Sequence, residues 1–154
     1  MADDFFDTSA LVKRHVNEVG SPWVRSLVHA KASHRVYIAR ITVVEVSSAI
    51  TRRQHKGDLS PAQAGAILGH FRRHLIQRYH ILELTPSLFT EAMRAARKHR
   101  LRAYDAVQLA VALEVHRLHQ NAGLGPVILV SADQDLNTAA TAEGMAVDDP
   151  TMHP

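Results

Sequence analysis

The apolar residues of this chain follow two alternating patterns along its length. Short continuous apolar runs, several of them β-branched, are typical of buried strands. Longer segments repeat apolar residues three and four positions apart, as helices do when one side faces a core. The strand-like runs cover residues 5–7, 36–39, 79–84, 127–130 and 145–147.

Capping and turn residues mark the ends of the helices between these runs. Residues 21–22, 60–61 and 85–86 each place a hydroxyl side chain before proline, which favours the first helical turn. Thr8 or Ser9 can cap the first helix, and Thr42 opens a helix that stops at Gly57. Two further helices occupy residues 101–123 and 133–144. This alternation predicts a single domain, residues 1–154, with a three-layer α/β/α sandwich around a short, mostly parallel sheet.

One helix is expected inside the molecule, because residues 106–113 are apolar almost throughout. Only Asp105 and Gln108 interrupt it, three positions apart and therefore on one face. A carboxylate beside a buried helix is costly unless a cation or several donors meet it, so Asp105 needs a partner from elsewhere in the chain. Gln108 is expected to pack in the core with an internal hydrogen bond, or else to support the site around Asp105.

Composition narrows the functional classes. The formal net charge is +3, and cysteine is absent, which removes disulfides, thiolate metal sites and cysteine nucleophiles. The acidic N-terminus lacks the basic and apolar regions of a signal peptide, and no apolar run reaches the roughly 20 residues of a membrane span. We therefore expect a cytoplasmic location.

Two groups of basic side chains offer contacts for phosphate groups. They contain Arg94, Arg97, Lys98, Arg100 and Arg102 before Asp105, and Arg52, Arg53 and Lys56 at the end of an earlier helix. Each group is equally consistent with a solvated helix face or with cations favoured near a helix C-terminus. Aromatic residues make up only 5% of the chain, so a base-stacking platform for single strands is not expected.

Four acidic residues are expected at the edge of the sheet where the strands end. Asp7 follows the first strand, Asp133 follows residues 127–130, Glu45 lies in the helical turn after the second strand, and Asp105 heads the buried helix. Ligands of open α/β sheets bind at this edge. Neighbouring carboxylates repel one another and need a counter-cation or a proton. Oxygen ligands alone favour Mg²⁺ or Mn²⁺, which assist chemistry on phosphates.

Each of these acids also has a purely structural interpretation. Asp7 can act only as a helix cap, and Asp133 and Asp135 can be turn and cap residues. Thr42 and Glu45 match the spacing of a capping box, in which the glutamate reaches back to the first amide of the helix. Both roles place Glu45 at the same edge of the sheet.

Histidine pairs are a second possible source of metal ligands. His70 and His74 are four positions apart on a helix, and His116 and His119 are three apart, so each pair could chelate. No third ligand or HExxH pattern accompanies them, and we therefore expect these histidines on the surface.

Four short motifs that contain the acids follow one another along the chain: Asp7-Thr8-Ser9-Ala10, Thr42-Val43-Val44-Glu45, Ala103-Tyr104-Asp105-Ala106-Val107-Gln108-Leu109-Ala110 and Ser131-Ala132-Asp133-Gln134-Asp135-Leu136. Their order and spacing resemble the PIN domain, and the chain is similar to the VapC-like ribonuclease toxins of prokaryotic toxin–antitoxin pairs. Each motif alone is weak, but the four in order are specific, and they extend over essentially the whole chain.

The resemblance implies a Mg²⁺- or Mn²⁺-dependent endoribonuclease. The positions that match the family's acids are Asp7, Glu45, Asp105 and Asp133, with Asp7 and Asp105 the safest ion ligands and Asp135 a weaker additional one. Ser9 matches a polar position that supports the site by hydrogen bonding. The resemblance also implies a homodimer, neutralised by a small antitoxin protein that occupies the active-site groove.

The hypothesis that follows is in-line attack of an activated water on an RNA phosphodiester, with one or two ions held by the four acids. The residues expected to position the RNA backbone are Arg97, Lys98, Arg100 and Arg102.

Two other classes of protein are the alternatives. A haloacid-type phosphatase needs Asp-x-Asp after its first strand, where this chain has Asp7-Thr8-Ser9, and a receiver domain needs an aspartate where Thr85-Pro86 follows residues 79–84. A non-catalytic PIN-like domain that only binds RNA or a partner protein would have no need for a costly group of four carboxylates.

Overall fold

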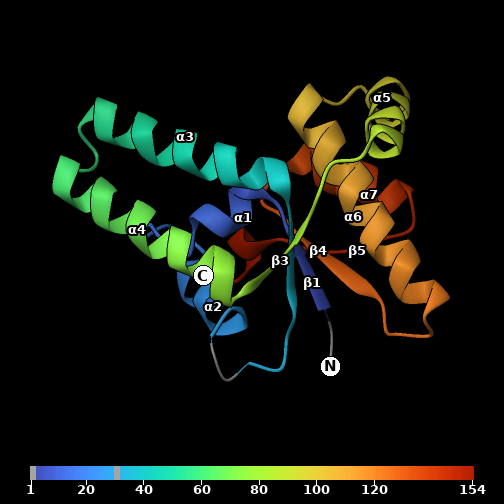
Figure 1. Cartoon of the computed structure of the whole chain (residues 1–154), viewed down its shortest axis with the longest axis horizontal. Helices are drawn as coiled ribbons and strands as arrows, with labels where there is room; N and C mark the ends of the chain where they lie inside the picture. Colours follow the sequence, from blue (N-terminus) through green and yellow to red (C-terminus); the bar gives the residue numbers. More distant parts are fainter. Residues whose placement is uncertain (1–2, 30–31) are drawn as a thin grey trace.

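The computed structural model describes residues 3–29 and 32–154 and contains a sheet of five parallel strands with helices on both faces (Figure 1). The strands are β1 (Asp3–Phe6), β2 (Val36–Ala39), β3 (Tyr79–Leu82), β4 (Val127–Val130) and β5 (Ala146–Asp148). Their order across the sheet is β3-β2-β1-β4-β5. The predicted α/β/α sandwich is confirmed, and its sheet is parallel throughout.

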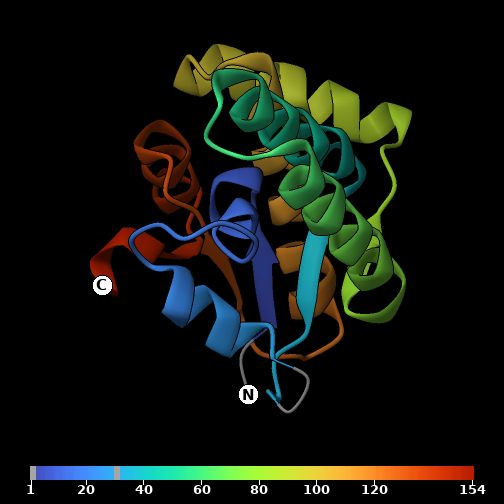
Figure 2. The ribbon, with the colours of Figure 1, turned by 90° about the vertical axis from the view of Figure 1, so that its left-hand side faces the viewer.

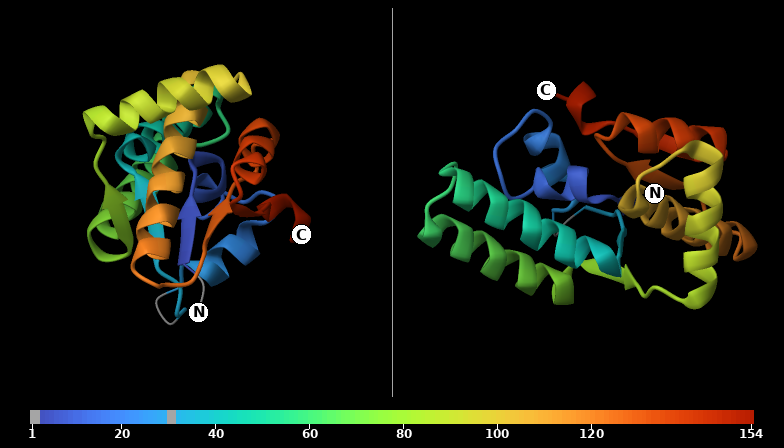
Figure 3. Two further views of the ribbon diagram at one scale, coloured as in Figure 1. Left: turned by 90° about the vertical axis from the view of Figure 1, so that its right-hand side faces the viewer. Right: turned by 90° about the horizontal axis from the view of Figure 1, so that it is seen from above.

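The helices form two outer layers. One layer contains α1 (Thr8–Val12), α2 (Ser21–Leu27), α3 (Arg40–Lys56) and α4 (Pro61–Gln77), which Figure 2 shows in front of the sheet. The other contains α5 (Pro86–His99), α6 (Ala103–Asn121) and α7 (Gln134–Ala142), as seen in Figure 3. The chain closes with a short 3-10 helix, η1 (Pro150–Met152). Among the described helices, none combines the length and apolarity needed to cross a membrane.

Strand β1 lies at the centre of the sheet and contributes to both cores. Its side chains alternate, so Phe5 packs against α5, α6 and α7, while Phe6 packs against the opposite layer. Asp3 and Asp4 are also buried in this strand, where the Arg35 guanidinium lies 2.7 Å from Asp3 and the His34 ring 2.9 Å from Asp4. These partners explain why the strand begins at Asp3, earlier than its apolar residues predict.

Helix α6 lies inside the molecule, as its sequence predicts. It packs against β2 and β4 of the sheet and against α5 and α7 on either side. Its buried residues include Ala106, Leu109, Val111 and Ala112. Asp105 stands in the first turn of this helix, close to the C-terminal edge of the sheet.

Two predicted helix caps are wrong, whereas the cap role considered for Asp7 is confirmed. Asp7, and not Thr8 or Ser9, caps α1, because its carboxylate accepts a hydrogen bond from the Ala10 amide at 3.1 Å. Helix α3 begins at Arg40 rather than Thr42, without a side-chain cap. The proposed capping box of Thr42 and Glu45 therefore does not form, which frees the Glu45 side chain for contacts with other helices.

The surface location expected for the paired histidines is wrong for one member of each pair. His74, on α4, is buried and makes an edge-on contact with the ring of Tyr79 in β3. His119, on α6, is buried and makes a similar contact with Tyr37. His70 is exposed, as expected.

Candidate active site

Asp7 is the most deeply buried of the predicted acids. It directly follows β1, only 4% of its surface is exposed, and its Oδ1 accepts hydrogen bonds from Ser9 Oγ at 2.8 Å and the Ala10 amide at 3.1 Å. Burial raises the pKa of Asp7 to about 7, although these hydrogen bonds lower it, and the charge of Glu45 adds to the rise. The hydrogen bonds therefore hold the carboxylate in place, while burial favours its protonated form.

Ser9 joins the two loops that follow β1 and β4. Its hydroxyl donates to Asp7 and accepts a hydrogen bond from the Ala132 amide at 2.9 Å. These contacts fix the Asp7 carboxylate relative to the loop that carries Asp133.

Glu45 is held by side chains from two other helices. Its Oε1 accepts from Thr8 Oγ1 at 2.9 Å and from Gln108 Nε2 at 2.8 Å, and the same Gln108 nitrogen donates to Thr42 Oγ1 at 2.8 Å. Both roles considered for Gln108 thus coincide, since it is buried with internal hydrogen bonds and also supports an acid. That acid is Glu45, on a neighbouring helix.

Asp105 and Asp133 form a second pair, bridged by one arginine. Arg102 donates to Asp105 Oδ2 at 3.2 Å and to Asp133 Oδ2 at 3.3 Å. Burial raises the pKa of Asp105 and the charge of Asp133 raises it further, while Arg102 opposes both effects; the charge of exposed Asp135 makes a smaller contribution in the same direction as Asp133. Asp133 also caps α7 by accepting from the Leu136 amide, so its cap role and its place at the site coexist.

The four acids come together as two pairs, Asp7 with Glu45 and Asp105 with Asp133. Within residues 3–29 and 32–154, no three His, Asp or Glu side chains are arranged around a single ion position. The donor set nevertheless fits Mg²⁺ or Mn²⁺, because every ligand offered is a carboxylate oxygen. Burial is the main cause of the raised pKa values of Asp7 and Asp105, and the charge of a neighbouring acid adds to the rise in each case, so a divalent ion held here would stabilise the charged carboxylates.

The basic residues expected to hold RNA differ in their positions. Arg102 reaches the acids, whereas Lys98 donates to Glu143 at 2.9 Å and so ties α5 to the end of α7. Arg100 ends α5 in the left-handed conformation, with φ of 56°. Arg97 lines a shallow hollow on α5 together with Lys98.

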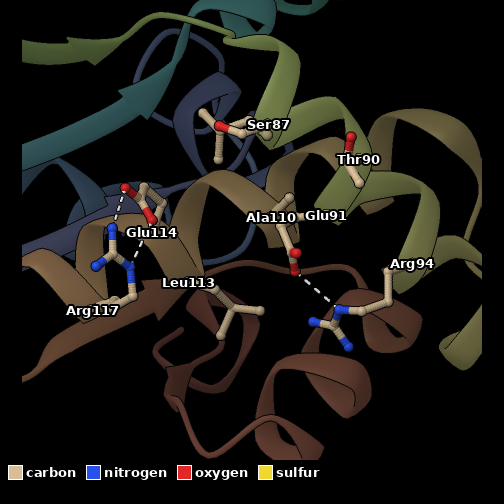
Figure 4. A pocket seen from close by; sticks show the side chains of 9 residues that line it. Ser87, Thr90, Glu91, Arg94, Ala110, Leu113, Glu114 and Arg117 are labelled. Carbon is tan, nitrogen blue, oxygen red and sulfur yellow. Dashed lines mark hydrogen bonds and ion pairs between the residues drawn. The ribbon is translucent and has the colours of Figure 1, made fainter.

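A wide hollow lies away from these acids. It has a volume of about 610 Å³ between α5 and α6, and its polar wall consists mainly of ion pairs between Glu91 and Arg94 and between Glu114 and Arg117 (Figure 4). A smaller hollow of about 190 Å³ lies directly beside Glu45. It is lined by Thr8, Ile41, Val44, Glu45, Ser48, Arg52 and Tyr104.

Sequence reasoning missed two contributors to this region, Thr8 and Tyr104. Each stands next to a predicted acid in the sequence, which was the available signal. The contact of Thr8 with Glu45 spans 37 positions and depends on how α1 packs against α3.

Comparison with known proteins identifies the family. The PIN domain model matches residues 5–141, and the chain belongs to this family. The solved structures that share its fold include the following three. Mycobacterium tuberculosis VapC20, described as a sarcin-ricin loop cleaving toxin, is 17% identical with a TM-score of 0.64, and the match covers 98% of this chain and 99% of that one.

The second structure is PAE2754 from Pyrobaculum aerophilum, 20% identical with a TM-score of 0.63, covering 98% of this chain and 85% of that one. The third is a toxin–antitoxin complex from Klebsiella pneumoniae, 16% identical with a TM-score of 0.60, covering 96% and 97%. No curated protein sequence matches the chain.

Proposed function

We propose that this protein is a Mg²⁺- or Mn²⁺-dependent endoribonuclease that acts as the toxin of a toxin–antitoxin pair in the cytoplasm. The observation that carries the proposal is the pairing of buried or half-buried carboxylates at the C-terminal edge of the sheet, where α/β domains bind ligands. Membership of the PIN domain family and the similarity of the fold to VapC20 support it.

Asp7 and Asp105 would be the main ion ligands, with Glu45 and Asp133 beside them and Asp135 within reach of the second pair. A bound Mg²⁺ or Mn²⁺ supplies Lewis acidity for attack of water on a phosphodiester. A ligand side chain that is already held in position needs little rearrangement when the ion binds. Ser9 holds Asp7 in this way by a hydrogen bond, and Thr8 and Gln108 hold Glu45.

Arg102 has a second role in this proposal. Its side chain is 78% exposed while it bridges Asp105 and Asp133, so it can leave the acids at small cost. When it leaves the carboxylates, its guanidinium would be positioned to hold the RNA phosphate, because arginine binds phosphate oxygens with two parallel hydrogen bonds. Arg97, Lys98 and Arg100 would guide the RNA backbone further from the bond that is cut.

The partner protein is proposed to be a small antitoxin that covers the acidic edge. Several structures with this fold are toxin–antitoxin complexes, from Klebsiella pneumoniae and Neisseria gonorrhoeae among others. Co-expression with the product of the neighbouring reading frame is expected to suppress RNA cleavage. Undiminished cleavage in a stable complex would contradict inhibition at this edge.

A homodimer is proposed to form over an apolar groove between α5 and α6. The groove has a volume of about 320 Å³ and is almost entirely apolar. Phe89 and Met93 line it with half or more of their surfaces exposed, which is unusual for an isolated chain. Met93→Glu is expected to reduce the mass measured by light scattering to that of a monomer, whereas Ile76→Glu on α4 should leave it unchanged.

RNA cleavage tests the proposed function. Purified protein is expected to cut RNA with Mn²⁺ or Mg²⁺ and not with EDTA. Asp7→Asn and Asp105→Asn should each lower the rate by about 100-fold or more, since each removes a charged ligand. The control is Asp58→Asn, which changes an exposed acid outside the two pairs. Wild-type cleavage by Asp105→Asn would reject the proposal, and tight RNA binding without cleavage by the wild type would favour a non-catalytic domain.

A further inference from the structure

The hollow beside Glu45 is lined mostly by residues that have no role in the proposed metal site. Five of its lining residues are on α3, at positions 41, 44, 45, 48 and 52, which share one helical face. Thr8 of α1 and Tyr104 of α6 close the other sides. Its volume of about 190 Å³ lies below the range of roughly 300–1,000 Å³ usual for whole drug-sized ligands, so it suits a fragment.

Each element around the hollow also carries a proposed metal ligand. Thr8 follows Asp7, Tyr104 precedes Asp105, and Glu45 itself lines the hollow. A group bound here would therefore lie next to a phosphate held at the acids. In a nucleic acid, the groups attached next to a phosphate are a ribose and its base.

The chemistry of the walls matches a base better than a second phosphate. Ile41, Val44 and Tyr104 offer apolar and aromatic surface, and the Tyr104 side chain is 59% exposed. An exposed aromatic ring beside a nucleic-acid site can stack on a base of any identity, because every base has a π-face. Glu45 in the same wall disfavours another anion.

Hydrogen-bond donors stand at the far side of the hollow. Arg52 donates to Ser48 Oγ at 3.1 Å, which uses one of the five N–H donors of the guanidinium. Both side chains are exposed and line the hollow. The remaining donors can reach acceptor atoms on the edge of a base that is not paired with another strand.

We propose that this hollow binds one unpaired RNA base adjacent to the bond that is cut, with Tyr104 stacking on the base and Arg52 and Ser48 recognising its edge. This inference rests on the proposed endoribonuclease function and adds the side chains that would select the base beside the cut. The low content of aromatic residues predicts no stacking platform of several rings, and this proposal needs only one ring, that of Tyr104.

Kinetics with a short single-stranded RNA test the proposal. Tyr104→Ala is expected to raise KM about tenfold with a smaller effect on kcat, since stacking contributes to binding. Tyr104→Phe keeps the ring and should retain wild-type KM. Arg52→Gln should also raise KM and should flatten the preference among the four bases at one position beside the cut. Ile76→Ala, on the exposed side of α4, is the control.

Two further measurements keep the outcomes distinct. Tyr104 also lines the apolar groove proposed to form the dimer, so the mass of each variant is measured by light scattering to detect any change in oligomeric state. Arg52 and Ser48 do not line that groove.

Binding of the same RNA is measured in an Asp7→Asn background, where cutting is prevented. Unchanged KM and RNA affinity in both Tyr104→Ala and Arg52→Gln, in a protein that cuts RNA, would overturn the base site alone. Absence of metal-dependent cutting by the wild type would instead reject the proposed function.

Discussion

Asp7 shows how a single residue can oppose folding while serving a site. The carboxylate is buried, and its hydrogen bonds from Ser9 and Ala10 do not offset the cost of removing its charge from water, so its pKa rises from 3.8 to about 7. The folded protein therefore holds a proton on Asp7 that the unfolded chain has already released. Between about pH 4 and pH 7, this linkage makes the folded state less stable as the pH rises.

Asp7→Asn is expected to stabilise the metal-free protein at pH 8 by about 2 kcal/mol, because asparagine caps a helix as well as aspartate and carries no charge. The gain should vanish near pH 4, where Asp7 is protonated in the folded state. Urea denaturation at the two pH values, with EDTA present, measures it. A variant less stable than the wild type at pH 8 would show that the Asp7 charge is well solvated.

His15 produces the opposite pH dependence. Burial lowers its pKa from 6.5 to about 3, and the charges of Arg14 and Arg25 and the neighbouring rings of His70 and His74 act in the same direction. The unfolded chain binds a proton below about pH 6.5 that folded His15 does not, so stability falls as the pH falls.

His15→Gln should therefore lose less stability than the wild type on acidification, by about 2 kcal/mol between pH 7 and pH 5. Denaturation at both pH values is the measurement, and the difference between the two proteins removes contributions from other groups. Parallel curves for the two proteins would mean that His15 is protonated in the folded state.

At the scale of single residues, sequence reasoning found the acids but not all of their partners. The Arg102 contact with Asp105 spans three positions on a helix start, a spacing that sequence can suggest. The Gln108 contact with Glu45 spans 63 positions, and it exists only because α3 and α6 meet across the end of β2. A contact of that kind depends on packing and not on a local pattern.

At the scale of elements, the sequence pattern predicted every strand and α-helix that the structure describes, with ends within a few residues, but not the short 3-10 helix η1. The start of α3 was also misplaced, because Ala39 stands at its N-cap position and has no side chain that could cap the helix and mark the boundary at Arg40. The predicted start of β1 was two residues too late. Asp3 and Asp4 are charged, which argues against a buried strand, and only the folded structure shows that Arg35 and His34 pair with them.

Gly20 determines how the C-terminal segment packs against α2. Its φ is 87°, and a Cβ added there would collide with the carbonyl group of Pro150 in η1. Trp23 and His153 stack with ring centroids 4.1 Å apart at the same contact. The backbone of η1 therefore lies so close to Gly20 that no side chain fits at position 20.

Gly20→Ala is expected to destabilise the protein by about 3 kcal/mol, from backbone strain combined with overpacking. Gly57→Ala is the matched control, since its φ is 89° but no atom lies within 4 Å of the added Cβ. The control should lose only about 1 kcal/mol. Equal losses in thermal unfolding would show that η1 moves aside without cost.

At the scale of the whole molecule, strand order determines which acidic residues lie near one another. The sheet places β1 between β2 and β4, so the segments that follow these three strands meet at one edge. That arrangement brings Asp7, Glu45 and Asp133 together with the N-terminus of α6, although they are separated by more than one hundred positions in the chain. The sequence predicted this edge because an all-parallel sheet aligns its strand ends. It did not predict that the acids would form two pairs with Arg102 between two of them.

The central claim is that the two acid pairs act as one metal site, and direct titration with Mn²⁺ tests it most simply. Calorimetry on the wild type should detect Mn²⁺ binding that Asp58→Asn retains. Asp7→Asn and Asp105→Asn, although they alter different pairs, should each abolish or greatly weaken that binding. Binding by Asp105→Asn with wild-type affinity and stoichiometry would contradict the claim.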